Sequence, residues 1–546
     1  MISVKNIVSF GIGSILGGII FCLIYGIKVI DPLYDSWLMS GNDLTQHYIG
    51  WIFFRNADWT FPIGLFDSLS YPLKLSITYL DSIPLMALFF KLFRQILPDT
   101  FQYIGIWGIM CFMLQGGIGM LILNTFKIRT GYMISGSIMI ILTPVLLQRM
   151  FWHSALGGHW LILLSIYVII IDYHNYKKYN CTIILICILA TLIHPYLAAM
   201  VVLLFSMNSL YCLCMKKESW RSGILSIALC FCGCIFTLLM TGAFSGDTIG
   251  FYDGFGDASA NLNSFINNLG HTNLGIALPV NVKYPEEGYA YLGAGVVFLL
   301  IFDLIIMIRH KKQIKVLKKR KILISSGMIM IILIALSPHI DINEYNLFNV
   351  KYPGCFVRIF NIFRSNGRFL WLIYYPLIIW AIVYAGKAAK RINMAILFLS
   401  VIIQMTDIFP VLYDKNSMFA QKYVYESSLK SLLWDEFGER GFRKIQFLSC
   451  RPESEDHTTY AYLGLQVMHD LAYYGSKNNM KLSNYYIARE DLGESNKIKH
   501  TIWKELLEQR ADRDSLYIFP EYPDEIVFQK NFRLEEIDHI WVGRLE

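Results

Sequence analysis

The chain has 546 residues, of which 55% are hydrophobic and 16% are charged, and its mean hydropathy is +0.45. This composition excludes a soluble globule with a polar surface and predicts a polytopic membrane protein. The formal net charge of +7 is unevenly distributed, because bases outnumber acids in residues 1–410 while acids outnumber bases in residues 411–546. We therefore expect a mainly α-helical, basic membrane domain followed by a mildly acidic soluble domain.

The first apolar segment, residues 7–27, is followed by no cleavage site of small residues. It is expected to stay in the membrane as a signal anchor, with the N-terminus in the cytoplasm. Residues 28–100 then form one long segment that we expect outside the membrane. Within it, the apolar stretch 81–98 carries Lys91 and Arg94 on one flank, which favours an interfacial helix. A true span at 81–98 is the alternative.

The remaining topology follows from the basic segment 309–321, which contains no acid. Cytoplasmic loops retain such positive charge, so we expect this segment in the cytoplasm. Counting outward from it gives about eleven spans and places the C-terminal domain on the outer face of the cytoplasmic membrane. The predicted spans after the first lie near residues 101–124, 131–147, 157–173, 180–193, 196–214, 222–240, 289–308, 322–336, 370–385 and 392–409.

Residues 411–546 change in character, from long apolar segments to short strands that alternate with helices. This alternation predicts a small α/β domain with a partly parallel sheet. The domain has neither a glycine-rich phosphate loop nor a cluster of Cys and His, so we expect it to bind or dock rather than to catalyse. Strands are expected at residues 444–449, 482–488, 515–519 and 537–542, and helices at residues 460–474 and 497–510.

Acidic residues of the membrane domain gather in the segments that we expect outside. Asp43 follows the first span by about fifteen residues, at the position where a lipid-linked substrate would meet a general base. Asp81 is the second candidate for this role, and other aspartates of the first external segment are expected to form turns or helix caps. The aromatic and basic run after Asp43 supplies the candidate substrate-binding residues Gln46, His47 and Arg55.

The candidate phosphate ligands are arginines and histidines of later external segments. Arg364 and Arg368 are four residues apart, so on a helix both would face one way and could hold phosphate oxygens bidentately. Interfacial anchoring by extended side chains is the alternative. Arg149, His153 and His159 are further candidates for phosphate binding. A weaker alternative is that His153 or His159 joins Asp43 in binding a divalent ion. His194 is expected to be structural.

The external segment 241–288 is rich in glycine and asparagine. Its aspartates Asp247, Asp253 and Asp257 are not spaced as a calcium loop. We expect this segment to form a lid over the site, with a plain linker as the alternative.

Several motifs together resemble an uncharacterised bacterial branch of the GT-C membrane glycosyltransferases, over roughly residues 1–410. They are Gly-Asn-Asp-Leu-x-Gln-His-x-x-Gly-Trp-x-Phe-Phe-Arg at 41–55, Phe-Pro-x-Gly at 61–64, Asp-Ser-Ile-Pro at 81–84, Glu-Gly-Tyr-Ala-Tyr-Leu-Gly at 287–293 and Phe-Arg-Ser-Asn-Gly-Arg-Phe-x-Trp at 363–371.

This resemblance implies a fold and an activity. It implies transfer of a sugar from a polyprenyl phosphate donor to an acceptor glycan, lipid or protein on the outer face of the membrane, with Asp43 as base or metal ligand. Many members carry a second acid in the next external loop, whereas this chain has Arg149, His153 and His159 there. Dependence on a divalent metal such as Mg²⁺ or Mn²⁺ is therefore left open.

Two other classes of function are compatible with the composition. A polysaccharide or lipid transporter would be expected to carry ionisable residues deep in several spans, and these spans are nearly free of charge apart from Asp303. A non-catalytic scaffold would use the C-terminal domain to bind an envelope partner. Nothing in the sequence indicates a nucleic-acid partner.

Overall fold

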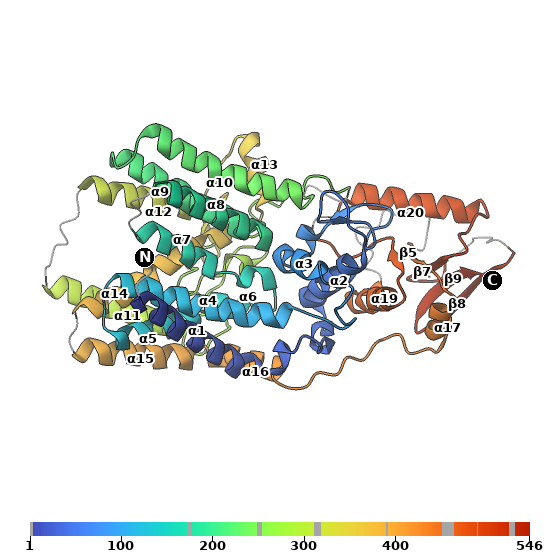
Figure 1. Ribbon diagram of the computed structural model, residues 1–546, viewed down its shortest axis with the longest axis horizontal. Coiled ribbons are helices and arrows are strands. Elements are labelled where there is room, and N and C mark those ends of the chain that lie inside the picture. The colour runs from blue at the N-terminus through green and yellow to red at the C-terminus, as the bar shows by residue number, and fades with distance from the viewer. Residues whose placement is uncertain are drawn as a thin grey trace.

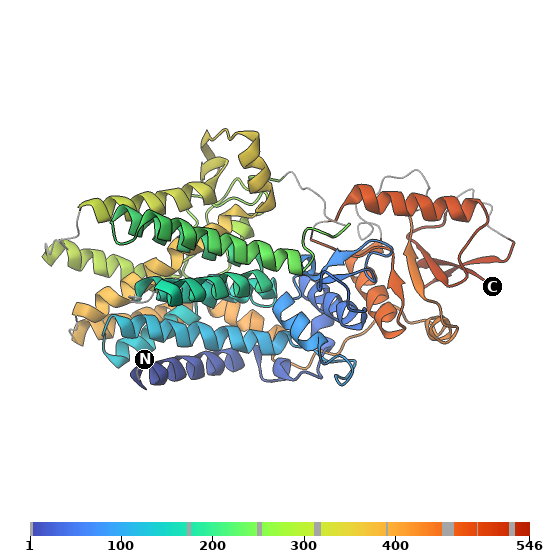
Figure 2. The same cartoon turned by 45° about the horizontal axis from the view of Figure 1, so that its top comes forward.

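The computed structural model describes residues 4–171, 176–247, 254–310, 318–388, 391–449, 463–488, 490–523 and 530–546. Asp253, the middle of the basic segment 309–321 and the start of the predicted helix 460–474 lie outside these residues. The described chain is mainly helical and elongated, with a bundle of long helices at one end and a sheet at the other (Figures 1 and 2). Helices α2 and α3 lie between the two parts in both views.

Each segment predicted as a span is helical, but the helices differ in length. Within the described residues, six helices are long and apolar enough to cross a membrane, or seven if one pair bent by 55° is a single span. Three more apolar helices are shorter, so the predicted total of about eleven crossings stays a prediction. The long set comprises α1 (Val4–Tyr25), α4 (Ile104–Thr125), α5 (Thr130–Ile141) with α6 (Pro144–Arg149), α9 (Pro195–Cys214), α10 (Trp220–Met240) and η6 (Asn366–Leu370) with α14 (Trp371–Ala388).

The other helices of the bundle pack around this set. The bent pair is α15 (Arg391–Asp407) with α16 (Phe409–Phe419). The remaining helices are η4 (Ser154–Gly157), α7 (Trp160–Ile170), α8 (Tyr176–Ile193), η5 (Pro285–Gly288), α11 (Ala294–His310), α12 (Lys318–Leu336) and α13 (Gly354–Ile362), with the hairpin β3 (His339–Ile342) and β4 (Tyr345–Asn349) between α12 and α13.

Helices α1 and α4 approach closely because glycines face each other at their crossing. A Cβ added to Gly13 would lie 2.3 Å from the carbonyl oxygen of Gly116, and one added to Gly116 would lie 2.2 Å from that of Gly13. Small residues let membrane helices gain contact over their backbones. This contact holds the end of α1 against the start of α4, so the segment that follows α1 starts from a fixed position.

Residues 28–103 form a compact layer over this end of the bundle. Its elements are η1 (Lys28–Ile30), η2 (Ser36–Met39), α2 (Asn42–Asn56), the short strands β1 (Leu65–Phe66) and β2 (Leu75–Ser76), η3 (Ile77–Leu80) and α3 (Pro84–Lys91). The helix expected over 81–98 is therefore shorter. Lys91 is buried, 3.9 Å from the centre of the Phe54 ring, so it does not form the polar flank that an interfacial helix needs.

The C-terminal part contains a five-stranded sheet in the order β6-β5-β7-β9-β8. As expected, the sheet is partly parallel, because β5 pairs with β6 and β7 in parallel. The predicted single strand at 537–542 is wrong: Asp538 and His539 have positive φ and make the turn of a hairpin. The elements are α17 (Leu433–Glu439), β5 (Lys444–Phe447), α19 (Leu465–Lys477), β6 (Lys481–Leu482), α20 (Leu492–Leu507), β7 (Ser515–Phe519), β8 (Phe532–Ile537) and β9 (Ile540–Leu545).

This C-terminal part is docked on the layer formed by residues 28–103. Helix α19 packs against α2, and Leu482 exchanges backbone hydrogen bonds with Ser68 and Tyr71. Lys481 forms an ion pair with Asp67 at 2.8 Å. The contacts extend the sheet edge onto the layer formed by residues 28–103, so the two parts form a continuous surface.

Within the segment expected as a lid, residues 254–288 are packed by their asparagines. Asn263 Nδ2 donates to Asn343 Oδ1 at 2.7 Å, and Asn267 Nδ2 donates to the carbonyl oxygen of Leu278 at 2.9 Å. Both asparagine side chains are buried. In this conformation the segment is part of the bundle, and its opening stays a prediction.

Candidate functional site

Asp43 lies in the first turn of α2, where the positive end of the helix dipole favours a carboxylate. The C-terminal part supplies its neighbour: the Tyr486 hydroxyl donates to Asp43 Oδ1 at 3.1 Å. Gln46, one turn along α2, donates from Nε2 to the carbonyl oxygen of Tyr486 at 2.7 Å. Gln46 thus positions the segment that carries Tyr486.

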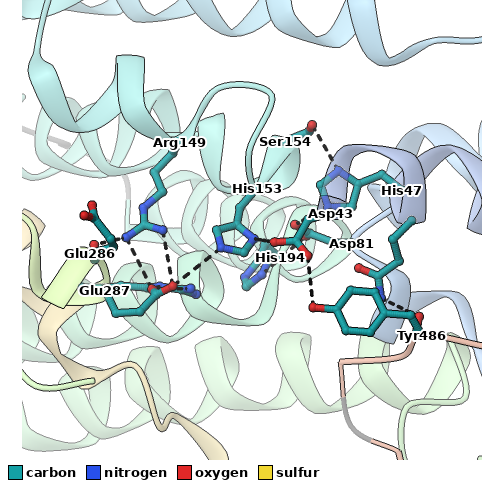
Figure 3. Close-up of polar contacts among 12 residues, drawn as sticks. Asp43, His47, Asp81, Arg149, His153, Ser154, His194, Glu286, Glu287 and Tyr486 are labelled. Atoms are coloured by element: carbon teal, nitrogen blue, oxygen red, sulfur yellow. Dashed lines mark hydrogen bonds and ion pairs between the residues drawn. The ribbon is translucent and has the colours of Figure 1, made fainter. Parts of the chain in front are cut away.

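His153 stands between two carboxylates, as Figure 3 shows. Its Nδ1 is 3.5 Å from Asp43 Oδ2, and its Nε2 is 3.6 Å from Glu287 Oε1. The exposed fractions of the three side chains are 22% for His153, 19% for Asp43 and 15% for Glu287, so a substrate can reach each of them. The imidazole connects the two acids into one polar row.

Two arginines hold Glu287 from the other side. Arg149, at the end of α6, places Nη2 at 3.4 Å from Glu287 Oε2. Arg368 donates from Nε to the same oxygen at 2.5 Å, and its Nη2 forms an ion pair with that oxygen at 2.5 Å. Burial alone raises the pKa of Glu287, but the charges of Arg149 and Arg368 outweigh burial and hold the pKa well below its usual range. Glu287 is therefore ionised and lies between the neutralising charges of the two arginines.

Arg368 reaches Glu287 because η6 lies directly against η5. A Cβ on Gly367 would be 2.6 Å from the Cα of Gly288, so only glycine permits this approach. The guanidinium of Arg368 also lies 4.5 Å from the ring centre of Tyr196. Both contacts fix the direction of the buried arginine.

A second group lies next to this row, around Asp81. Its Oδ2 is 3.3 Å from His47 Nε2 on α2, and its Oδ1 is 3.5 Å from His194 Nε2 at the start of α9. Burial disfavours the charged form of Asp81, yet the imidazoles of His194 and His47 lower its pKa to about 2. One ligand atom each from His47, Asp81 and His153 lie within 4.8 Å of one another, which is a donor set for a metal ion.

The predicted residues that join the site are Asp43, Asp81, His47, His153, Arg149 and Arg368, with Gln46 beside it. Arg55 does not join them: at the far end of α2, it is buried and donates to the carbonyl oxygens of Leu97 and Pro98. His159 is also elsewhere, buried against Trp371 with Nδ1 at 2.6 Å from the Tyr375 hydroxyl. It is not placed to bind a metal together with Asp43.

The helix expected to carry both Arg364 and Arg368 is interrupted. Helix α13 ends at Ile362 and η6 begins at Asn366, so the two arginines do not share a helical face. Arg368 is buried in the site, whereas Arg364 is exposed. The two alternatives therefore apply to different residues. Phosphate binding suits Arg368, and anchoring at the membrane interface suits Arg364.

Sequence reasoning missed the site roles of three residues. Glu287 stands in a motif and in an acid-rich segment expected outside the membrane, which was a usable signal. His194 was read as structural, but it faces Asp81. Tyr486 gave no signal, because it lies in a domain to which no chemistry was assigned.

Comparison with known proteins matches residues 14–409 to the family described as "Domain of unknown function (DUF6311)" and residues 433–545 to the "DUF6311 C-terminal domain". No curated protein and no solved structure matches the chain. The first match contains the row from Asp43 to Arg368, and the second contains Tyr486. The membrane domain and the docked domain that together build this site thus mark the chain as a member of the DUF6311 family.

Proposed function

We propose that the protein is a membrane glycosyltransferase, which transfers a sugar from a polyprenyl phosphate donor to a cell-envelope acceptor on the outer face of the cytoplasmic membrane. One observation carries the proposal: a solvent-reachable carboxylate, Asp43, shares a row of polar groups with two buried arginines at one end of a bundle of apolar helices. A base for the acceptor and cations for the leaving phosphate are the two requirements of this reaction.

The step can be written for the residues of the row. The acceptor hydroxyl oxygen attacks the anomeric carbon, the bond from that carbon to the phosphate oxygen breaks, and Asp43 takes the hydroxyl proton. Polyprenyl phosphate leaves with the bonding electrons. Arg149 and Arg368 offer several N–H donors near one point, which suits phosphate oxygens. Glu287 orients both arginines and shares them with the phosphate when the donor binds.

The orientation of the helices supports the outer face. Helices α4, α9 and α14 all begin at the site end: Gly105 contacts Val29, His194 precedes α9 and Arg368 precedes α14. They therefore end at the opposite face of the bundle, where Lys127, Lys216 and Lys387 follow or close them. Lysines favour the cytoplasmic side, so the site and the C-terminal domain would lie outside.

The C-terminal domain takes part in the site under this proposal. Tyr486 contacts Asp43, so we assign acceptor binding to the Tyr486 side of Asp43 and donor binding to the arginine side. A cavity of about 390 Å³ lies between this domain and residues 53–74, at the opposite end of α2 from Asp43. Its lining includes Asn56, Asp67 and Lys481, which suit the distal part of a long acceptor with many hydroxyls.

The test compares cells with and without the gene. Mass spectrometry of envelope glycans and of polyprenyl-linked sugars should show one glycan lost and one lipid-linked sugar accumulated in the deletion strain. The purified full-length protein should then consume that lipid-linked sugar when the acceptor is supplied. Identical glycan and lipid profiles in the two strains would refute the proposal.

A further inference from the structure

We propose that His47, Asp81 and His153 bind one divalent transition-metal ion, Zn²⁺, beside Asp43. The three residues come from α2, from the turn after η3 and from the turn before η4, and one ligand atom of each lies within 4.8 Å of the other two. Figure 3 shows these side chains converging from separate elements. Metal binding depends only on these three side chains. A role of the metal ion in sugar transfer rests on the proposed function.

The spacing of the closest pair matches zinc coordination. Zinc binds nitrogen and carboxylate oxygen at about 2.0–2.2 Å in a tetrahedron, whose ligand atoms are then about 3.3–3.5 Å apart. His47 Nε2 and Asp81 Oδ2 are 3.3 Å apart. This is longer than a good hydrogen bond, and the pair does not meet hydrogen-bond geometry.

His47 is prepared as a ligand by its second nitrogen. Its Nδ1 is 3.2 Å from Ser154 Oγ, which can accept the Nδ1 proton and leave a lone pair on Nε2. Among the described residues, Nε2 is buried and has no hydrogen-bond partner. A metal-binding histidine typically donates its other N–H to a neighbour in this way.

Asp81 is held toward His47 by an unusual backbone. Asp81 and Ile83 both have positive φ, at 53° and 51°. Ser82 between them fixes the bend: its hydroxyl donates to the carbonyl oxygen of His47 at 2.7 Å, and its own carbonyl oxygen accepts from Tyr103. Backbone strain of this kind persists where the surroundings enforce it, and it gathers at functional sites.

The remaining neighbours orient the ligands. Whichever nitrogen of His153 binds the ion, the other nitrogen faces a carboxylate, Asp43 or Glu287. His194 is different, because its Nδ1 accepts the backbone N–H of Tyr196 at 3.1 Å. Its proton is then on Nε2, toward Asp81, so His194 orients the carboxylate and is not itself a ligand.

The donor set selects the kind of ion. Two imidazoles and one carboxylate suit Zn²⁺, whereas Mg²⁺ prefers oxygen ligands in an octahedron. Three protein ligands also leave a fourth position open, as in catalytic zinc sites. An ion in this place would lie on the Asp43 side of the row, where its positive charge would add to that of Arg149 and Arg368 at the leaving phosphate.

The test measures zinc on the purified full-length protein, prepared in detergent with a tag that does not bind metal. After loading with Zn²⁺ and removal of the excess, elemental analysis should give about one ion per chain for the wild type. His47→Gln and Asp81→Asn should fall to background; asparagine also tolerates the left-handed backbone at position 81. Loading with Co²⁺ should give visible absorption typical of four-coordinate cobalt in the wild type but not in the two ligand variants.

Two matched variants control for residue type. His539→Ala removes a histidine whose side chain is 99% exposed, and Asp58→Asn removes an aspartate whose side chain is 95% exposed. Both should keep the ion. Zinc should also raise the unfolding temperature of the wild type and of these controls, because the ion binds the folded state only.

A wild type without zinc or cobalt signal, or ligand variants that keep the ion, would overturn the inference. If the ligand variants fail to fold, the wild-type stoichiometry and cobalt spectrum decide alone. Sugar transfer by a protein that binds no zinc would refute the metal site and leave the proposed function standing. A zinc-bound protein without any transfer activity would refute the proposed function and leave the metal site standing.

Discussion

Replacing Arg368 by lysine separates phosphate recognition from simple charge. Arg368 donates a hydrogen bond from Nε to Glu287 at 2.5 Å, forms an ion pair with the same carboxylate through Nη2, and lies over the ring of Tyr196. Lysine keeps the positive charge but has one nitrogen on a flexible stem, so it cannot present the planar fork. If the fork holds the donor phosphate, Arg368→Lys loses at least one charge-assisted hydrogen bond in the transition state.

The size of this loss follows from the contact. A hydrogen bond to a charged group contributes about 1.5–3 kcal/mol, and each 1.36 kcal/mol is tenfold in rate, so kcat/KM for the donor should fall about 10- to 150-fold. Arg368→Ala should cost more, because it leaves Glu287, whose side chain is 15% exposed, with one arginine of the two. Breaking a fully buried pair destabilises a protein by about 3–5 kcal/mol, which is the upper bound for this partly exposed one. Lysine is therefore the informative substitution.

The assay is donor-dependent turnover at matched amounts of protein, with thermal unfolding measured on the same samples. Arg364→Lys is the control, because Arg364 lies four residues earlier and is exposed. It should behave like the wild type in both measurements. Wild-type turnover by Arg368→Lys would refute the phosphate role of this arginine and move the search to Arg149.

Three further predictions concern the docked domain and the topology. Tyr486→Phe removes the hydroxyl that donates to the Asp43 carboxylate. A hydrogen bond to a charged group contributes about 1.5–3 kcal/mol, so transfer should fall by up to about 10- to 150-fold, and an unchanged rate would exclude Tyr486 from the site. Burial lowers the pKa of His469 to about 4, whereas an unfolded chain protonates histidine near pH 6.5. The unfolded state binds the extra proton between these values, so this contribution to stability is present above pH 6.5 and up to about 3 kcal/mol is lost as the pH falls to 4. His469→Gln should flatten the pH dependence of thermal unfolding, and an identical slope would contradict the assignment. Reporter fusions after Glu546 and within residues 309–321 should report the outside and the cytoplasm respectively, and a cytoplasmic signal after Glu546 would reverse the proposed orientation.

The apolar helices and part of the sheet could be predicted from the sequence because their signals are local. Hydropathy over about twenty residues locates helices such as α4 and α9, and the run Ser515–Phe519 is a strand as expected. The hairpin at Asp538 was missed although Asp538 and His539 interrupt the apolar residues, because a two-residue turn without glycine or asparagine is a weak signal. The break after α13 was missed although Ser365-Asn366-Gly367 is a turn signal.

The only site residues that could be predicted are those whose type and position in the sequence suggest a chemical role. Asp43, Asp81 and His153 could be selected as polar groups in segments expected outside the membrane. Their partners could not, because the contacts join distant positions: Tyr486 reaches Asp43 across 443 residues, and Glu287 meets Arg149 across 138. Arg55 and His159 have suitable chemistry, but tertiary packing turns their side chains into the protein interior.

Sugar transfer by Asp43→Asn tests directly whether Asp43 is the general base of the proposed reaction. Asparagine keeps the size of the side chain and its place in the first turn of α2, but it cannot take the acceptor proton. Transfer from the polyprenyl-linked donor should fall on the order of a hundredfold or more while the protein still inserts and purifies. Asp31→Asn, a change at an exposed aspartate of the same segment, should transfer at the wild-type rate. Near-wild-type transfer by Asp43→Asn would contradict the account.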